Sequence, residues 1–234
     1  QVYNKDTEIK IIGKYIGNFE PDEILKEIKN RLKPSKNKGK IERIFDKEPE
    51  EVNQKYMEKT MSISMPIFMI GIKDKSVEVS EKVKRHMAID IILGILIGKS
   101  SKLYKELYEK QILFGELDSE YEFSREYAHI LISGQSNNPQ LVEKMFKEEV
   151  EKIKTEGLKT DDFDRIKRKI YGDFVTEFND VASISRMFLA DTIKQINSFD
   201  YAEKYNSVTK EYAMQVLNEV FNEDKMVLSV IKGN

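Results

Sequence analysis

Residues 80–110 read SEKVKRHMAIDIILGILIGKSSKLYKELYEK, and this stretch decides the predicted fold. Its first part predicts a long helix, because apolar residues recur at helical spacing on one broad face. These residues are Val83, Met87, Ala88, Ile91, Ile92 and Ile95. The segment Gly98-Lys-Ser-Ser101 then ends this helix with a glycine and supplies a serine cap for a second helix, which extends to Lys110.

Strand patterns lie on both sides of these helices. Upstream, the apolar run at residues 67–72 predicts a central strand that is buried on both faces, and the alternating segment at residues 57–65 predicts another strand. Downstream, residues 121–133 predict one strand and residues 225–231 a closing strand. Further helices are predicted at residues 139–154, 160–196 with an interruption near residue 179, and 209–221. We therefore expect an α+β fold, with an antiparallel or mixed β-sheet and long helices packed on one face.

The N-terminal part of the chain carries a separate pattern. Residues 9–16 predict a short strand, and Pro21 predicts a helix start, because proline suits the first helical position. Asp22 and Glu23 support this start, since acidic side chains stabilise the positive end of a helix. Residues 34–40 combine turn-forming residues and lysines without apolar periodicity, which indicates an exposed connector. The expected parts are a strand–helix unit at residues 1–34, a linker at residues 35–47 and a main domain at residues 48–234.

The charge balance and the absence of cysteine narrow the classes of function. The chain has 39 basic and 41 acidic side chains, so its formal net charge of −2 creates no overall field to attract nucleic acid or an anionic membrane. No apolar run reaches the roughly 18–20 residues that a membrane-spanning helix needs. The lack of cysteine excludes disulfides, thiolate zinc sites and a cysteine nucleophile, and it fits a reducing compartment. We expect a cytoplasmic protein without nucleic-acid or membrane partners, and Gln1 as first residue indicates a piece of a longer chain.

The sequence contains no complete catalytic or metal motif. The segment Gly94-Ile-Leu-Ile-Gly98-Lys-Ser100 is one spacer residue short of a phosphate-binding loop and lies in a helical pattern, so a nucleotide-binding enzyme is a disfavoured alternative. A zinc site normally needs about three protein ligands and a nearby carboxylate. The chain has only two histidines, His86 and His129, and Asp90 follows His86 by four residues. We expect His86 at a surface or interface and His129 packed in a strand. The sequence therefore predicts no catalytic and no metal-binding residue.

Several stretches, read in order, resemble the C-terminal half of the M16 zinc metallopeptidases, the family of pitrilysin, insulinase and the mitochondrial processing peptidase. The helix–corner–helix segment at residues 92–110 and the segment Gly157-Leu-Lys-Thr160 with its acidic continuation are the most diagnostic. The others are residues 8–24, 133–139 and 208–212. Together they span nearly the whole chain, and the pattern is most similar to bacterial two-subunit members of the family.

This resemblance implies two homologous α+β halves that face each other like a clamshell around a peptide chamber. Zinc belongs to the N-terminal half of such a parent protein, on an inverted His-Xaa-Xaa-Glu-His helix that is absent here, so no cofactor is expected in this chain. Residues 1–34 would close the preceding N-terminal half, and residues 48–234 would form the inactive C-terminal domain. The implied role is a non-catalytic chamber wall, and the alternative is a structural subunit without proteolytic activity.

The resemblance also implies partners and chamber residues. The partners would be a peptide or unfolded polypeptide, the zinc-bearing half, and a homologous M16 subunit in a homo- or heterodimer. Many active members carry an arginine and a later tyrosine in this half, and here Tyr108 and Gly115 stand at those positions, so no catalytic residue is carried over. We expect the exposed face of the sheet to line the chamber, and the candidate chamber residues are Ser100, Ser101, Tyr104 and Tyr108.

Overall fold

A computed structural model describes residues 17–18, 20–31, 44 and 49–233 of the chain. Its helices and strands follow one another in this order: α1 (Pro21–Arg31), β1 (Tyr56–Thr60), β2 (Ile67–Asp74), α2 (Val79–Ile97), α3 (Lys102–Glu109), β3 (Leu113–Phe123), β4 (Ala128–Ser136), α4 (Pro139–Glu156), α5 (Thr160–Thr176), the 3₁₀ turn η1 (Glu177–Asn179), α6 (Val181–Lys194), α7 (Asp200–Lys204), η2 (Tyr205–Ser207), α8 (Lys210–Val220), η3 (Glu223–Lys225) and β5 (Met226–Lys232).

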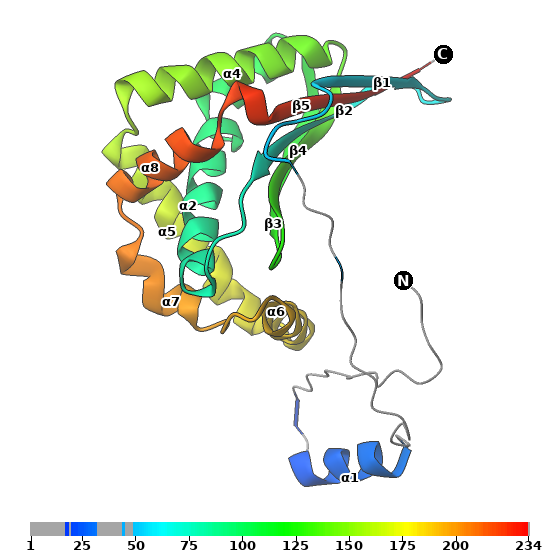
Figure 1. Cartoon of the computed structure of the whole chain (residues 1–234), viewed down its shortest axis with the longest axis vertical. Coiled ribbons are helices and arrows are strands. Elements are labelled where there is room, and N and C mark those ends of the chain that lie inside the picture. The colour runs from blue at the N-terminus through cyan, green and yellow to red at the C-terminus, as the bar shows by residue number, and fades with distance from the viewer. Residues whose placement is uncertain (1–16, 19, 32–43, 45–48, 234) are drawn as a thin grey trace.

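The strands form a mixed sheet in the order β1-β5-β2-β4-β3. β1 pairs with β5 in parallel, and the other neighbouring strands pair antiparallel. Figure 1 shows the long helices α2, α4, α5 and α8 gathered on one side of this sheet. The predicted α+β class, with a mixed sheet and helices packed on one face, is confirmed.

The central strand β2 is buried on one face, so the prediction of burial on both faces is wrong. Phe68, Ile70 and Ile72 point toward the helices and are at most 1% exposed. Ile67 and Met69 point the other way and are 39% and 40% exposed. The error arose because an unbroken apolar run is typical of a doubly covered strand, whereas in the described part of the chain helices cover only one face of this sheet.

A hairpin replaces the single strand that was predicted at residues 121–133. β3 and β4 pair antiparallel, and the backbone N–H of Ser124 donates to the carbonyl of Tyr127 across the turn between them. This turn, Ser124-Arg-Glu-Tyr127, contains none of the glycine, proline or asparagine residues that normally mark turns. The first half of β3 escaped prediction because β3 is an edge strand and most of residues 114–120 are exposed and polar.

The strand predicted at residues 57–65 is shorter than predicted, because β1 ends at Thr60. The other predicted elements agree with the structure within a residue or two, apart from α7, which was not predicted. α2 begins at Val79, one residue before the predicted start, and η1 is the predicted interruption near residue 179. α1 begins at Pro21 as predicted, and none of its residues is buried. The strand predicted at residues 9–16, and the linker predicted at residues 35–47 except Ile44, lie outside the described residues.

Two buried contacts fix the position of α2. The guanidinium of Arg85, whose side chain is 5% exposed, donates to both carboxylate oxygens of Asp74 at 2.8 and 2.7 Å and to Glu219 at 3.0 Å. The hydroxyl of Tyr121 donates to Asp74 as well, at 2.8 Å, so this network joins α2 to β2, β3 and α8. On the opposite side, Gly94 allows α5 to approach closely, because a Cβ atom at this position would lie 2.7 Å from Cγ2 of Ile166.

Candidate functional site

The corner between α2 and α3 is built as the sequence predicts. α2 ends at Gly98, and Ser101 caps α3, since its Oγ accepts a hydrogen bond of 3.1 Å from the backbone N–H of Tyr104. Ser101 is 6% exposed, so its hydroxyl is committed to the cap. The corner places Ser100 and Tyr104 beside a cavity.

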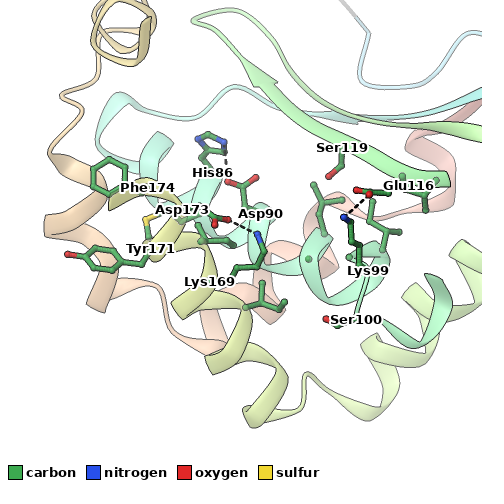
Figure 2. Close-up of a pocket in the computed structure, with 18 of the residues that line it drawn as sticks. His86, Asp90, Lys99, Ser100, Glu116, Ser119, Lys169, Tyr171, Asp173 and Phe174 are labelled. Carbon is green, nitrogen blue, oxygen red and sulfur yellow. Dashed lines mark hydrogen bonds and ion pairs between the residues drawn. The ribbon is translucent and has the colours of Figure 1, made fainter. Parts of the chain in front are cut away.

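This cavity has a volume of about 970 Å³ and lies between α2, α5 and the edge strand β3, with α3 and α7 at its ends. Figure 2 shows side chains of α2, β3 and α5 around it, among them Asp90, Glu116 and Phe174. Its size is near the upper end of the range usual for ligand pockets, which is about 300–1,000 Å³. Apolar side chains form much of its wall, among them Leu93, Ile97, Leu117, Ile166, Ile170 and Phe174. A cavity of this size can enclose one large side chain of a bound polypeptide.

Two of the four candidate chamber residues, Ser100 and Tyr104, line the cavity. Tyr108 stands beside it, 57% exposed and stacked on Tyr104 with ring centroids 6.0 Å apart. The hydroxyl of Tyr104 donates to the carbonyl of Gly115 at 3.3 Å, which ties α3 to the start of β3. Gly115 has a φ of +88°, a conformation that a tyrosine would adopt only with strain, so the family's tyrosine does not fit the backbone at this position.

Three polar side chains, those of His86, Asp90 and Tyr201, contact one another in the cavity. The Nδ1 atom of His86 lies 2.9 Å from the hydroxyl oxygen of Tyr201, and its Nε2 lies 3.3 Å from a carboxylate oxygen of Asp90. The ring of His86 also contacts Phe123 edge-on, with centroids 5.2 Å apart. Burial raises the pKa of Asp90, and the neighbouring His86 opposes that rise only in part. Burial also raises the pKa of Tyr201, so its phenol stays protonated at neutral pH.

Two ion pairs stand at the outer part of the cavity. Lys99 pairs with Glu116 at 2.6 Å, which links the end of α2 to β3. Lys169 pairs with Asp173 at 2.6 Å along α5. Both pairs are drawn in Figure 2 and are more than half exposed, so they contribute little to stability but set the charge around the opening.

The two histidines do not form a common site. His86 lies on the helix side of the sheet at the cavity, and its side chain is 24% exposed. His129 lies on the open face of the sheet, where its register neighbours are Lys73 and Glu122 and its ring stacks on Tyr127. Among the residues that the structure describes, no group of three or more histidine, aspartate or glutamate side chains is arranged to hold a metal ion. Within the same residues, no helix is long and apolar enough to cross a membrane.

Sequence reasoning missed Asp90, Phe174 and Tyr201 as cavity residues. The pair His86–Asp90, four residues apart on α2, was the one available signal, because Asp90 interrupts the apolar run at residues 87–97. Phe174 and Tyr201 reach the cavity from α5 and α7, far along the chain, and only the tertiary arrangement brings them there.

Comparison with known families decides the classification. The family model described as "Peptidase M16 inactive domain" matches residues 15–170. The chain belongs to the peptidase M16 family. Because the match is to the inactive domain, the chain corresponds to the inactive C-terminal domain of a zinc-protease-like protein.

The chain is also similar to individual proteins, and the solved structures among them share its fold. The uncharacterized zinc protease YmfH of Bacillus subtilis (strain 168) is 26% identical over 225 residues, which cover 91% of this chain and 50% of that protein. An M16-like peptidase from Alicyclobacillus acidocaldarius has a structure with a TM-score of 0.84, 21% identity, and coverage of 93% of this chain and 53% of its own. A protease from Helicobacter pylori gives a TM-score of 0.78 and 19% identity, with the same two coverages of 93% and 53%. The chain thus spans about half the length of these proteins.

Proposed function

We propose that this chain is the non-catalytic C-terminal domain of a zinc-dependent M16 metalloendopeptidase, and that it forms one wall of a peptide-binding chamber opposite a zinc-bearing half. The observation that carries the proposal is the cavity of about 970 Å³ beside the edge strand β3. Among the strands that the structure describes, β3 pairs only with β4, so its outer edge offers backbone groups to an extended polypeptide, and the cavity offers space for one of the side chains of that polypeptide.

The remaining parts of the proposal follow the family resemblance. Zinc and the residues that hold it would belong to the N-terminal half of the parent protein, and the name of the relative YmfH as a zinc protease supports this. Residues 1–34 would complete that half, residues 35–47 would connect, and residues 48–234 would form the inactive domain. The partners would be a peptide or unfolded polypeptide, the zinc-bearing half and a homologous M16 subunit. The cysteine-free sequence supports a reducing compartment such as the cytoplasm.

A labelling experiment tests the proposal and identifies which face lines the chamber. The chain has no cysteine, so a single fluorescent label can be placed at Ser119→Cys, beside the cavity, or at Met69→Cys, on the open face of the sheet. The labelled chain is combined with the zinc-bearing half and titrated with a peptide that carries a quencher. We expect stronger quenching of the label at position 119, because the cavity and the free edge of β3 lie there.

Other outcomes have distinct meanings. Stronger quenching at position 69 would assign the chamber wall to the open face of the sheet, as the sequence predicted. No saturable quenching at either position, although the two halves associate, would contradict peptide binding and favour the structural-subunit alternative.

A further inference from the structure

We infer that the cavity between α2, α5 and β3 is a subsite for a lysine or arginine side chain, with the carboxylate of Asp90 as its charge partner. The inference rests on the proposed function, because it names the side chain that a bound polypeptide would place in the cavity. Three features carry it: the balance of charges around the cavity, the surroundings of Asp90, and the apolar walls between Asp90 and the opening.

The cavity holds more negative than positive charge. Its lining includes four carboxylates, on Asp90, Glu116, Asp173 and Glu177, and two lysines, Lys99 and Lys169. Each lysine is paired with a carboxylate at 2.6 Å, on Glu116 and Asp173. In the described part of the chain, Asp90 has no lysine or arginine partner, and Glu177 forms no ion pair. Two carboxylates therefore remain for a cation from outside.

Asp90 is placed to receive such a cation. Its side chain is 35% exposed where it meets the cavity, and the ring of His86 contacts one of its oxygens at 3.3 Å. A carboxylate has about four acceptor positions on two oxygens, so it can accept further hydrogen bonds from an ammonium or guanidinium group. Apolar side chains that line the cavity cannot hydrogen-bond a carboxylate, and burial raises the pKa of Asp90, so an incoming cation would compensate Asp90 for the part of its hydration that is lost.

The walls suit the long stem of a basic side chain. Leu93, Ile166 and Ile170 provide apolar surface along the cavity, and lysine and arginine pack their methylene groups on such surface while the charged end stays with a polar partner. The rings of Phe174 and Tyr201 also line the cavity, and aromatic faces attract cations. A neutral apolar side chain would fill the same space but leave the Asp90 carboxylate poorly solvated, and an acidic side chain would be repelled.

The test compares peptides that differ only in one side chain. The chain is combined with the zinc-bearing half, and the dissociation constants of three fluorescent peptides are measured, with a central lysine, norleucine or glutamate. Norleucine matches the lysine stem but lacks the charge. We expect the lysine peptide to bind about tenfold more tightly than the norleucine peptide. This is the change in dissociation constant that one hydrogen bond to a charged group produces in a partly exposed site.

Two variants assign the preference to Asp90. Asp90→Asn keeps the shape and removes the charge, and we expect it to reduce the lysine preference to less than about twofold. Glu109→Gln removes a carboxylate from the exposed side of α3, away from the cavity, and should leave the preference unchanged. Circular dichroism and thermal unfolding establish whether each variant is folded. If Asp90→Asn is not folded, the comparison of the three peptides on the unsubstituted chain still decides whether the cavity prefers lysine.

The outcomes separate this inference from the proposed function. Equal binding of the lysine and norleucine peptides, or a lysine preference that persists in Asp90→Asn, would overturn the subsite while leaving the chamber wall intact. Failure of all three peptides to bind the associated halves would overturn both.

Discussion

The close contact between α2 and α5 allows a quantitative prediction at Gly94. Replacement by alanine would place a Cβ atom 2.7 Å from Cγ2 of Ile166, whereas carbon atoms normally pack about 3.5–4.0 Å apart. The Cγ2 methyl group is attached directly to Cβ and cannot swing aside as the end of a long side chain could. The two helices must therefore separate by about 1 Å, or Ile166 must leave its preferred rotamer.

The net effect of Gly94→Ala combines two opposing terms. Overpacking of a well-packed core costs about 1–3 kcal/mol. Alanine in place of glycine inside a helix recovers about 1 kcal/mol. We therefore expect a loss of about 0–2 kcal/mol in the free energy of unfolding, measured by urea denaturation followed by circular dichroism.

A double-mutant cycle isolates the steric term from the helix propensity. Ile166 is 4% exposed, so Ile166→Ala alone should cost about 2–5 kcal/mol by leaving a cavity. In the Gly94→Ala background the same change removes the clashing methyl group, and it should cost less by about 1–3 kcal/mol. Equal costs of Ile166→Ala in both backgrounds would refute the reasoning, because they would show that the two positions do not meet.

Three further changes test other parts of the fold. Arg85→Met leaves the Asp74 carboxylate buried without its cation and should cost about 3–5 kcal/mol in urea unfolding, whereas a loss below about 1 kcal/mol would contradict the buried network. Asn138→Ala removes the side-chain acceptor for the N–H of Leu141 at the start of α4 and should cost about 1 kcal/mol in the same assay; an unchanged midpoint would exclude the cap. Burial raises the pKa of Asp191 in the folded chain, so the contribution of this residue to stability is fully present below the pKa of the unfolded chain and is lost as pH rises through the folded pKa. Asp191→Asn should therefore remove this decline in stability from a series of melting curves recorded above pH 4. A pH profile that the substitution leaves unaltered would contradict this prediction.

The sequence predicted the helical layer well because one-sided apolar periodicity determines it. Val83, Ile91 and Ile92 were placed on the inner face of the long helix, and all three are fully buried. The corner after Gly98 was also predicted, because glycine and serine have specific roles at helix ends. Such local rules depend on nearby residues alone, which the sequence provides.

Features that depend on distant segments were predicted less well. Ile67 and Met69 are as apolar as their buried neighbours, and only the placement of the helices shows that their side of the sheet is open. The acidic first half of β3 has no strand pattern because this edge strand is largely exposed. The sequence predicted no cavity here. Ser100 and Tyr104, which it named as candidate chamber residues, line the cavity from the corner, whereas Phe174 and Tyr201 join it from helices that fold back from later parts of the chain.

The most direct test of the proposed role measures zinc and peptide hydrolysis together. Zinc content and cleavage of a fluorogenic peptide are determined for this chain alone, for the zinc-bearing half alone, and for the two combined. We predict neither zinc nor cleavage for this chain alone, and cleavage with about one zinc ion per combined pair, as expected for a hydrolytic zinc site supplied by the partner half. Stoichiometric zinc or cleavage by this chain alone would contradict the proposed role, and the cavity at His86 and Asp90 would be the first place to look for the site.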